Sequence, residues 1–230
     1  ISHRMDEIKR IADRVTVLRD GAYIDTVDAA DTPLAKIIQL MVGREVTQNA
    51  PVIPDTSQNE VALDVRNLSR GKEVRDVSFS VRKGEILGFA GLMGAGRTEV
   101  ARIVFGADPR DAGEIFVHGQ PVDIRTPHAA VEAGIGYLSE DRKGDGIFLD
   151  MPISVNVSAL AVDQVASGLG LLSNRKEDQQ AAALGKKLNL KYGQLSDPVS
   201  SLSGGNQQKV AIAKMLSVNP KLIFLDEPTR

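Results

Sequence analysis

Residues 91–98 read GLMGAGRT, and this glycine-rich stretch constrains the fold more than any other part of the chain. It follows a predicted strand over residues 84–91 and leads into a helical pattern over residues 98–106. Such a turn presents backbone N–H groups and a helix N-terminus to an anion. The stretch therefore favours an α/β fold with a phosphate-binding turn, although a structural turn capped by Thr98 uses the same residue types.

The residue types inside this turn have separate uses. Gly91, Gly94 and Gly96 are predicted to allow positive φ angles and the close approach of phosphate oxygens. Thr98 is placed to offer its hydroxyl to Mg²⁺. Arg97 stands where the pattern G-x-x-x-x-G-K-[ST] has lysine, so the cation of the motif is unusual.

Two acids follow an apolar run near the end of the sequence. Residues 222–225 read LIFL and predict a buried strand, after which Asp226 and Glu227 emerge at its carboxyl end. Ligands of open α/β sheets bind at this edge. Asp226 is a candidate Mg²⁺ ligand and Glu227 a candidate base that orients or deprotonates water. The alternative is a solvated acidic pair at the end of a strand.

A second glycine-containing turn lies at the start of a helix predicted at residues 204–218. Ser203, Gly204 and Gly205 present a hydroxyl and bare backbone at the start of this helix. Helix N-termini attract anions, but an ordinary serine N-cap has the same appearance.

The sequence divides into three sections. Residues 1–45 predict helix, strand, strand and helix, with a hairpin turn at Asp20-Gly21. Residues 46–60 are polar, contain two prolines and predict a linker. Residues 61–230 predict strands and helices in alternation, interrupted at about 151–198 by a mainly helical insertion.

Composition narrows the choice of partners. The 230 residues carry 28 basic and 30 acidic side chains, for a net charge of −2, so bulk charge gives no reason to expect nucleic acid. The chain has no cysteine, which excludes a disulfide framework. No apolar run approaches the roughly 20 residues that span a bilayer.

The order of the motifs resembles ATP-binding-cassette ATPases. In that family the glycine turn is the Walker A loop, LSGGNQQ at residues 202–208 is the signature, and LIFLDEP at residues 222–228 is the Walker B strand. The resemblance implies a P-loop NTPase with a mixed sheet core, an antiparallel β-subdomain and a helical insertion. Three segments resemble the second cassette of tandem-cassette subunits that energise bacterial monosaccharide importers of the ribose, galactose and xylose type. Their sequences are VSFSVRKGEILGFAGLMGAGRTEV, YLSEDRKGDG and SLSGGNQQKV.

The resemblance implies a role for each matching residue. Residues 1–45 would be the tail of a first cassette, with His3 as its switch histidine, and residues 61–230 a second cassette truncated after Walker B. Glu227 would be the catalytic base, with Thr98 and Asp226 at the metal. Nucleotide binding is implied for one set of residues, namely Gly91, Leu92, Met93, Gly94, Ala95, Gly96, Arg97, Thr98 and Glu140. The signature set, acting on the partner cassette's ATP, is Ser203, Gly204, Gly205 and Gln207.

The resemblance also implies cofactors, partners and location. ATP and Mg²⁺ would be bound at the cytoplasmic, inner face of the cell membrane. The partners would be transmembrane permease subunits and the other cassette, with a periplasmic sugar-binding protein acting indirectly and no nucleic acid involved. The 139–165 region would face the permease.

Three departures from the family pattern concern this cassette's own nucleotide. Arg97 replaces the Walker lysine, Glu140 stands near the usual Q-loop glutamine, and no aromatic residue lies between Leu68 and Arg75. Arginine keeps the charge, but its planar fork does not fit the volume of a lysine ammonium. We therefore predict nucleotide binding with weakened hydrolysis, and little or no ATPase activity from these 230 residues alone.

Two other readings stay open at this stage. In one, the cassette is a non-catalytic, nucleotide-binding half that supports its partner. In the other, the chain belongs to a soluble tandem-cassette ATPase that acts on ribosomes or DNA; the short polar linker and near-neutral charge are not typical of that class.

Overall fold

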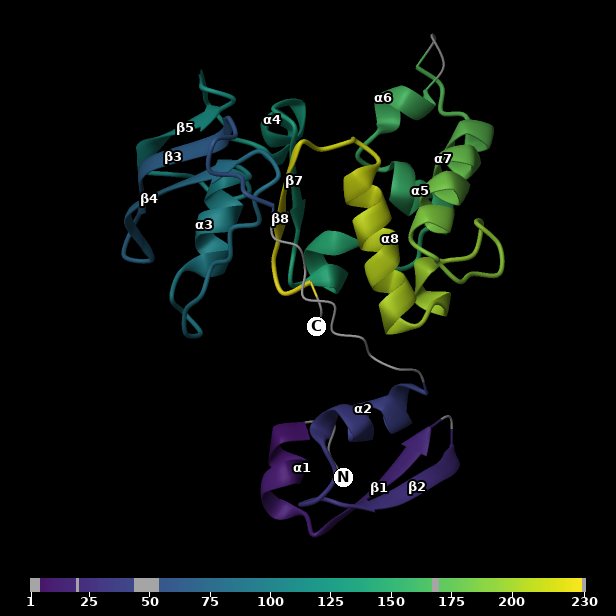
Figure 1. The fold of residues 1–230 in the computed structure, drawn as a ribbon. Coiled ribbons are helices and arrows are strands. Elements are labelled where there is room, and N and C mark those ends of the chain that lie inside the picture. The colour runs from purple at the N-terminus through teal and green to yellow at the C-terminus, as the bar shows by residue number, and fades with distance from the viewer. Residues whose placement is uncertain (1–4, 20, 44–53, 167–169, 229–230) are drawn as a thin grey trace. The chain divides into compact units, whose positions relative to one another are not determined.

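The computed structural model describes residues 5–19, 21–43, 54–166 and 170–228 (Figure 1). The chain divides into two compact units, residues 1–53 and residues 54–230, and each unit is treated by itself. The predicted linker at 46–60 lies mostly outside the described residues.

The smaller unit has the predicted order of helix, strand, strand and helix. Its elements are α1 (Met5–Ile11), β1 (Arg14–Arg19), β2 (Ala22–Asp28) and α2 (Leu34–Val42). The two strands pair antiparallel, and α2 ends at Gly43, which has a φ of 78°. Ile11 is 84% exposed, and Pro33 precedes α2 without a side-chain cap.

The larger unit begins with an antiparallel sheet, which confirms the predicted β-subdomain. Its strand order is β4-β3-β5-β6, with bounds β3 (Val61–Arg70), β4 (Val74–Arg82), β5 (Ala112–Val117) and β6 (Gln120–Val122). Helix α3 (Arg97–Val104) buries Val100, Ile103 and Val104 in the same apolar cluster as the inward residues of β3 and β5. The sheet therefore supplies the surface against which the helix after the glycine turn packs.

A parallel strand pair lies beside this subdomain (Figure 1). Strand β7 (Ile135–Leu138) pairs with β8 (Leu222–Leu225) in the register Ile135 to Leu222. Helix α4 (Pro127–Glu132) precedes β7, and the Thr126 hydroxyl caps it by accepting a hydrogen bond from the Ala129 N–H at 3.2 Å. The pair joins segments that are far apart in the sequence.

The strand predicted at residues 84–91 is absent. Residues 85–92 have no regular secondary structure, and Ile86 is 98% exposed. Phe89 makes an edge-to-face contact with Phe79, with ring centroids 5.0 Å apart, but a Cβ built on Gly88 would meet nothing within 4 Å. An apolar run becomes a strand only when another strand pairs with it, and no described strand pairs with this segment.

Strand β8 is also less buried than its apolar sequence predicts. Leu222 and Phe224 pack on the core of the β-subdomain, whereas Ile223 is 40% exposed and Leu225 54% exposed. The predicted strand is therefore present, but it is only partly buried, with one covered face.

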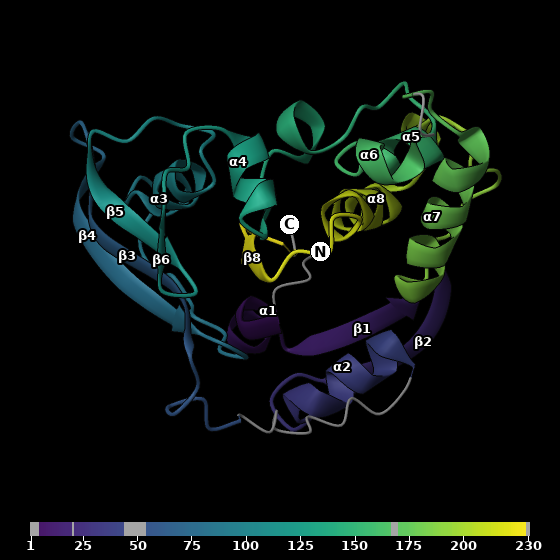
Figure 2. The same ribbon diagram turned by 90° about the horizontal axis from the view of Figure 1, so that it is seen from above.

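The helical part lies on the side of β8 opposite to the β-subdomain (Figure 2). Its elements, with the short π-helical turn before them, are η1 (Arg142–Gly146), α5 (Ile153–Ser158), α6 (Val162–Val165), α7 (Asn174–Lys187), η2 (Val199–Ser201) and α8 (Gly204–Leu216). A second apolar cluster forms its core, with Ile153, Val157 and Val210 among its buried members. The helical insertion is thus present, with α8 packed against it.

A buried asparagine organises the entrance to this helical part. Asn156 is fully buried, and its side-chain Oδ1 accepts from the Phe148 N–H at 2.7 Å. Its Nδ2 donates to the carbonyls of Phe148, Met151 and Pro152 at 2.9, 3.3 and 3.1 Å. This side chain therefore supplies the acceptor for the Phe148 N–H and adds to the main-chain hydrogen bonds that join the loop to Val199 and Ser200.

Replacing this asparagine tests its role in stability. Asn156→Ala leaves the Phe148 N–H without its acceptor, at a cost of about 1–3 kcal/mol, whereas the carbonyls that Asn156 contacts keep main-chain donors. We expect the midpoint of urea unfolding to fall clearly, with hydrogen exchange accelerated first in residues 147–157. Asn174→Ala, which changes an exposed asparagine of α7, is the control. Equal stability of the two variants would contradict the assignment.

Candidate functional site

The glycine turn before α3 has the geometry of an anion-binding loop. Gly96 is the N-cap of α3 and has a φ of 88°, and Gly94 has a φ of 79°. A Cβ on Gly96 would lie 2.8 Å from the Glu73 carbonyl oxygen, so glycine is required there for space as well as conformation. Gly91 does not have a positive φ; its need is spatial, because a Cβ would lie 2.9 Å from that of Ala95.

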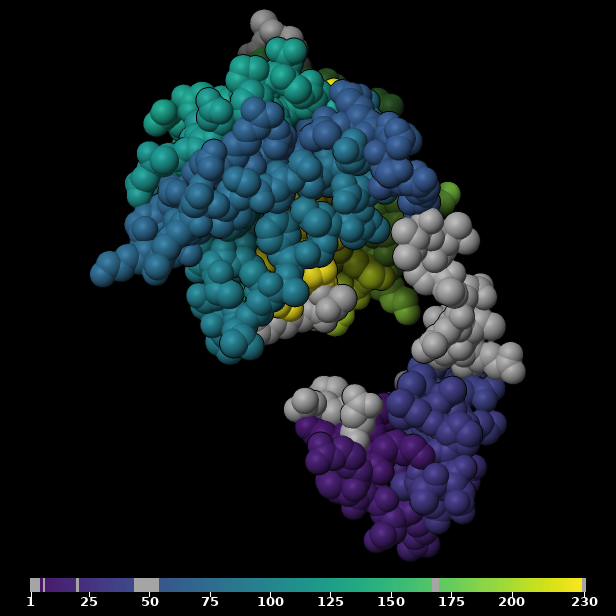
Figure 3. Space-filling model, turned by 60° about the vertical axis from the view of Figure 1, so that its left-hand side comes forward, coloured from purple at the N-terminus to yellow at the C-terminus, as the bar shows by residue number. Residues whose placement is uncertain are grey.

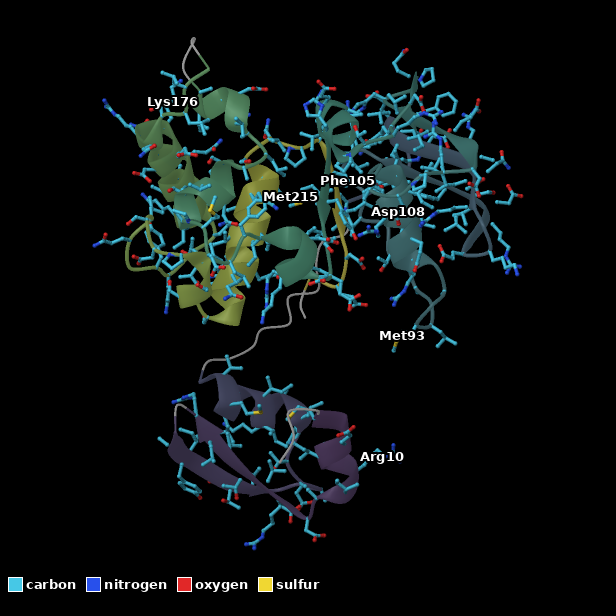
Figure 4. All side chains as sticks on the ribbon, turned by 180° about the vertical axis from the view of Figure 1, so that it is seen from behind. Arg10, Met93, Phe105, Asp108, Lys176 and Met215 are labelled. Carbon is cyan, nitrogen blue, oxygen red and sulfur yellow. The ribbon has the colours of Figure 1, made fainter. Side chains whose placement is uncertain are left out.

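Thr98 lies inside α3, as its second residue. The alternative in which Thr98 caps a structural turn is therefore wrong, because the cap position belongs to Gly96. The first N–H groups of a helix have no acceptor within the helix and are available to an anion. Met93, at the tip of the turn, is 98% exposed and projects away from the ribbon (Figure 4).

The two acids after β8 are held in a defined backbone conformation. The Asp226 N–H donates to the Leu138 carbonyl at 3.0 Å, which extends the β7–β8 ladder by one residue. Glu227 has a φ of 44°, a conformation that residues other than glycine seldom adopt. Backbone strain of this kind concentrates at functional sites, where surrounding structure maintains it.

Arg97 and Glu227 form an ion pair. The distance from Arg97 Nη1 to Glu227 Oε1 is 3.5 Å, and the two side chains are 37% and 44% exposed. The structure thus brings together the unusual cation of the glycine turn and the predicted base after β8, which are 130 residues apart in sequence. An exposed pair of this type contributes only about 0–1 kcal/mol, so its two members can exchange partners at low cost.

An open cleft of about 1300 Å³ separates residues 85–89 from β8. Arg97, Asp226 and Glu227 lie at its lining, whereas residues 91–96 and Thr98 do not. In the space-filling view, yellow atoms of the C-terminal part are visible at the surface next to the blue-green segment (Figure 3). Residues 85–89 line one side of the cleft and β8 the other, and residues 91–96 lie outside it.

The predicted signature residues differ among themselves in exposure. Ser203, Gly204 and Gly205 are exposed, and the Ser203 hydroxyl accepts from Asn206 Nδ2 at 3.0 Å instead of capping α8. Gln207 is buried, and its amide donates to the Leu202 carbonyl at 3.1 Å. Gln207 therefore holds the turn in shape within this chain, and its place in the predicted signature set stays a prediction.

The sequence reasoning missed the role of the turn after Glu140. Arg142 in η1 donates from Nη1 to the Gly204 carbonyl at 3.0 Å, and Asp145 in the same turn pairs with Arg102 of α3 at 3.0 Å. Glu140 itself is exposed and precedes this turn. The segment therefore connects the helix of the glycine turn to the start of α8. The alternating charges of SEDRKGDG were a signal for such contacts.

A carboxylate at the end of α3 anchors the same region. Asp108 accepts from Arg102 Nε at 3.0 Å and from Arg70 Nη1 at 2.9 Å. The hydrogen bond from Arg102 holds the pKa of Asp108 below its ordinary value. These contacts fix Arg102 and so also its reach to Asp145.

Tyr137 is a further residue that the sequence reasoning missed. Its hydroxyl donates to Asp226 Oδ2 at 3.1 Å. A tyrosine within a predicted core strand was the available signal, because a buried tyrosine hydroxyl usually has a hydrogen-bond partner.

The residues present fit Mg²⁺ with a nucleotide. A threonine hydroxyl and an aspartate carboxylate are hard oxygen donors, and Mg²⁺ is held by one or two carboxylates together with phosphates and water. Among the described residues no group of three acids, histidines or cysteines suits a metal ion held by protein alone. When bound, Mg²⁺ neutralises charge on phosphate oxygens, and the residues of this chain that would hold it are Thr98 and Asp226.

The family model described as ABC transporter matches residues 74–230, which include every element of this site. The chain belongs to the ABC transporter family. Its relatives include the ribose import ATP-binding protein RbsA of Ruegeria sp. (strain TM1040), which is 56% identical over 232 residues, covering 100% of this chain and 45% of the relative. Another is ribose import ATP-binding protein RbsA 2 of Agrobacterium fabrum, 51% identical over 232 residues, with 100% and 46% covered. The chain spans about half the length of the curated relatives it matches.

Solved structures confirm the cassette fold. A nucleotide-free ATP-binding cassette from an ABC transporter superposes with a TM-score of 0.61 at 22% identity, covering 74% of this chain and 70% of that one. A dimeric cassette in a post-hydrolysis state, bound to ADP and Pi, superposes with a TM-score of 0.59 at 21% identity, covering 73% and 74%. The ABC cassette described here has no helix, within the described ranges, of the length and apolarity needed to cross a membrane. His3 lies outside the described residues.

The glycine turn of this ABC cassette can be tested by adding one methyl group. In Gly96→Ala the Cβ meets the Glu73 carbonyl at 2.8 Å and the φ of 88° becomes strained. We expect loss of nucleotide binding, measured by titration with a fluorescent ADP analogue. Gly119→Ala is the matched control, because Gly119 has a φ of 74° but nothing within 4 Å of its Cβ. Normal binding by Gly96→Ala would show that the turn does not hold the phosphates.

Proposed function

We propose that this chain is part of the ATP-binding subunit of a bacterial monosaccharide importer, and that it binds ATP and Mg²⁺ with weakened hydrolysis. The proposal of import rests on relatives at 51–56% identity over the whole chain whose names are ribose import ATP-binding proteins. It also rests on the order of the glycine turn, the turn at Ser203 and the acids after β8 within one cassette. The partners would be permease subunits at the inner face of the cell membrane and a second cassette, with a periplasmic sugar-binding protein upstream.

The ion pair between Arg97 and Glu227 is the observation that carries the proposal of weakened hydrolysis. A base that polarises water needs a carboxylate oxygen free to accept from that water. Arg97 competes for such an oxygen, and while it pairs with Glu227 it is withdrawn from the phosphates. Binding is less affected, because the N–H groups of the turn and the N-terminus of α3 do not depend on this side chain.

Residues 203–205 would act on the nucleotide of the other cassette. Their exposure at the start of α8 supports this role, since backbone N–H groups at a helix N-terminus attract phosphate. The contact from Arg142 to Gly204 would hold this surface in a fixed relation to the turn after Glu140. Residues 1–45 would be the tail of the first cassette, with His3 as its switch histidine.

A non-catalytic role is the second candidate, and the same ion pair favours it. If Arg97 never leaves Glu227, the cassette holds nucleotide only to support its partner. The two candidates make different predictions for Arg97→Lys. No described contact favours an ATPase that acts on ribosomes or DNA.

Hydrolysis by Arg97→Lys distinguishes the candidates. In the intact importer, with the catalytic glutamate of the other cassette replaced, we expect Arg97→Lys to raise single-turnover ATP hydrolysis about ten- to hundredfold, because lysine serves the phosphates and releases Glu227. Glu227→Gln should abolish the gain. Arg175→Lys, on the exposed face of α7, is the control. An unchanged rate for Arg97→Lys would favour the non-catalytic role.

Transport supplies the test of the import proposal. We expect the intact subunit to co-purify with a membrane permease and to support ATP-dependent uptake of a monosaccharide into vesicles. Asp226→Asn should reduce Mg²⁺-dependent nucleotide binding without preventing co-purification, because Asp226 lies at the nucleotide. A subunit that purifies with ribosomes and not with a permease would overturn the proposal.

A further inference from the structure

The backbone of Asp226 is fixed by the parallel strand pair. Tyr137 stands opposite Phe224 and Leu138 opposite Leu225, and the Asp226 N–H continues the ladder to the Leu138 carbonyl. This pairing fixes the main chain of Asp226, but it does not fix the rotation of the carboxylate. A side-chain contact is needed for that.

Tyr137 supplies the contact. Its hydroxyl donates to Asp226 Oδ2 at 3.1 Å, and its ring packs against Phe105, which follows α3, with ring centroids 5.3 Å apart and planes tilted by 39°. The ring is thus held by the helix of the glycine turn while the hydroxyl holds the acid. Among the described residues, no protein group hydrogen-bonds to the other carboxylate oxygen, Oδ1.

The direction of this contact follows from the groups themselves. A tyrosine hydroxyl donates and a carboxylate oxygen accepts, so Tyr137 is the donor and Asp226 Oδ2 the acceptor.

We propose that Tyr137 is a positioning residue for the divalent cation: it turns the Asp226 carboxylate so that Oδ1 faces the metal bound with the nucleotide. The inference rests on the proposed function of a Mg²⁺–nucleotide site. Hydrogen bonds to metal-binding carboxylates from neighbouring side chains orient the ligand, and their loss typically weakens metal binding about 10–100-fold.

Tyr137→Phe separates this role from packing. The phenylalanine keeps the ring against Phe105 and removes only the hydroxyl. We would measure Mn²⁺ binding to the 230-residue chain in the presence of ADP from the free Mn²⁺ signal in electron paramagnetic resonance. The affinity for ADP in EDTA is measured in parallel, because it reports the glycine turn without the metal. Tyr192→Phe is the matched control, since Tyr192 lies in the exposed segment after α7.

We expect Tyr137→Phe to raise the dissociation constant for Mn²⁺ about tenfold while leaving metal-free ADP binding and the unfolding midpoint near those of the unmodified chain. In the Asp226→Asn background, the same change should have little further effect, because the residue acts through Asp226. Mn²⁺ affinity equal to that of the unmodified chain would overturn the inference, as would a parallel loss of metal-free ADP binding.

The outcomes also separate the inference from the function on which it rests. If the unmodified chain binds ADP in EDTA but gains nothing from Mn²⁺, the positioning role fails and the nucleotide site stands. If it binds no ADP with or without Mn²⁺, both fail.

Discussion

The parallel pairing of β7 with β8 is the constraint on which the rest of the site depends. It places Leu138 beside Leu225, and so brings the segment before Glu140 next to Asp226 and Glu227. Parallel strands need long crossover connections, and here the crossover contains the whole helical part. The helical insertion and α8 are therefore attached to the site by the same pairing that forms it.

Three contacts join the glycine-turn helix to this strand pair and its neighbours. Arg97 at the start of α3 reaches Glu227, Arg102 in its last turn reaches Asp145, and Phe105 at its end packs against Tyr137. The three residues are spread along α3 and its C-cap. A displacement of α3 would therefore change the surroundings of Glu227, of the turn after Glu140 and of Asp226 together.

The exchange of lysine for arginine has a structural consequence beyond charge. A guanidinium is a planar, extended group that suits a carboxylate, and in this cassette it meets the carboxylate of Glu227. Arg97 therefore competes with any other group that would bind the Glu227 carboxylate. The positive φ of Glu227 adds a conformational constraint at the same residue.

Several elements could be predicted from local sequence. The antiparallel β-subdomain, the hairpin of the smaller unit and the helix after the glycine turn all follow from short-range patterns of apolar residues, glycine and turn residues. The positive φ at Gly94 and Gly96 also follows from the motif. The strand predicted at residues 84–91 is wrong, because apolar residues indicate that a segment can form a strand but do not show that a second strand pairs with it. The burial of Gln207 was missed for a related reason: its amide bonds to the chain just before α8, and residue type alone does not distinguish an inward amide from an outward one.

The sequence by itself determined the family, the order of the motifs and the identity of Arg97, because these depend on residue type and spacing. Only the tertiary structure decided that Arg97 meets Glu227, that Tyr137 holds Asp226 and that Arg142 reaches Gly204. These contacts join residues separated by 62 to 130 positions. Their physical basis is the parallel ladder and the packing of α3, and neither leaves a periodic signal in the sequence.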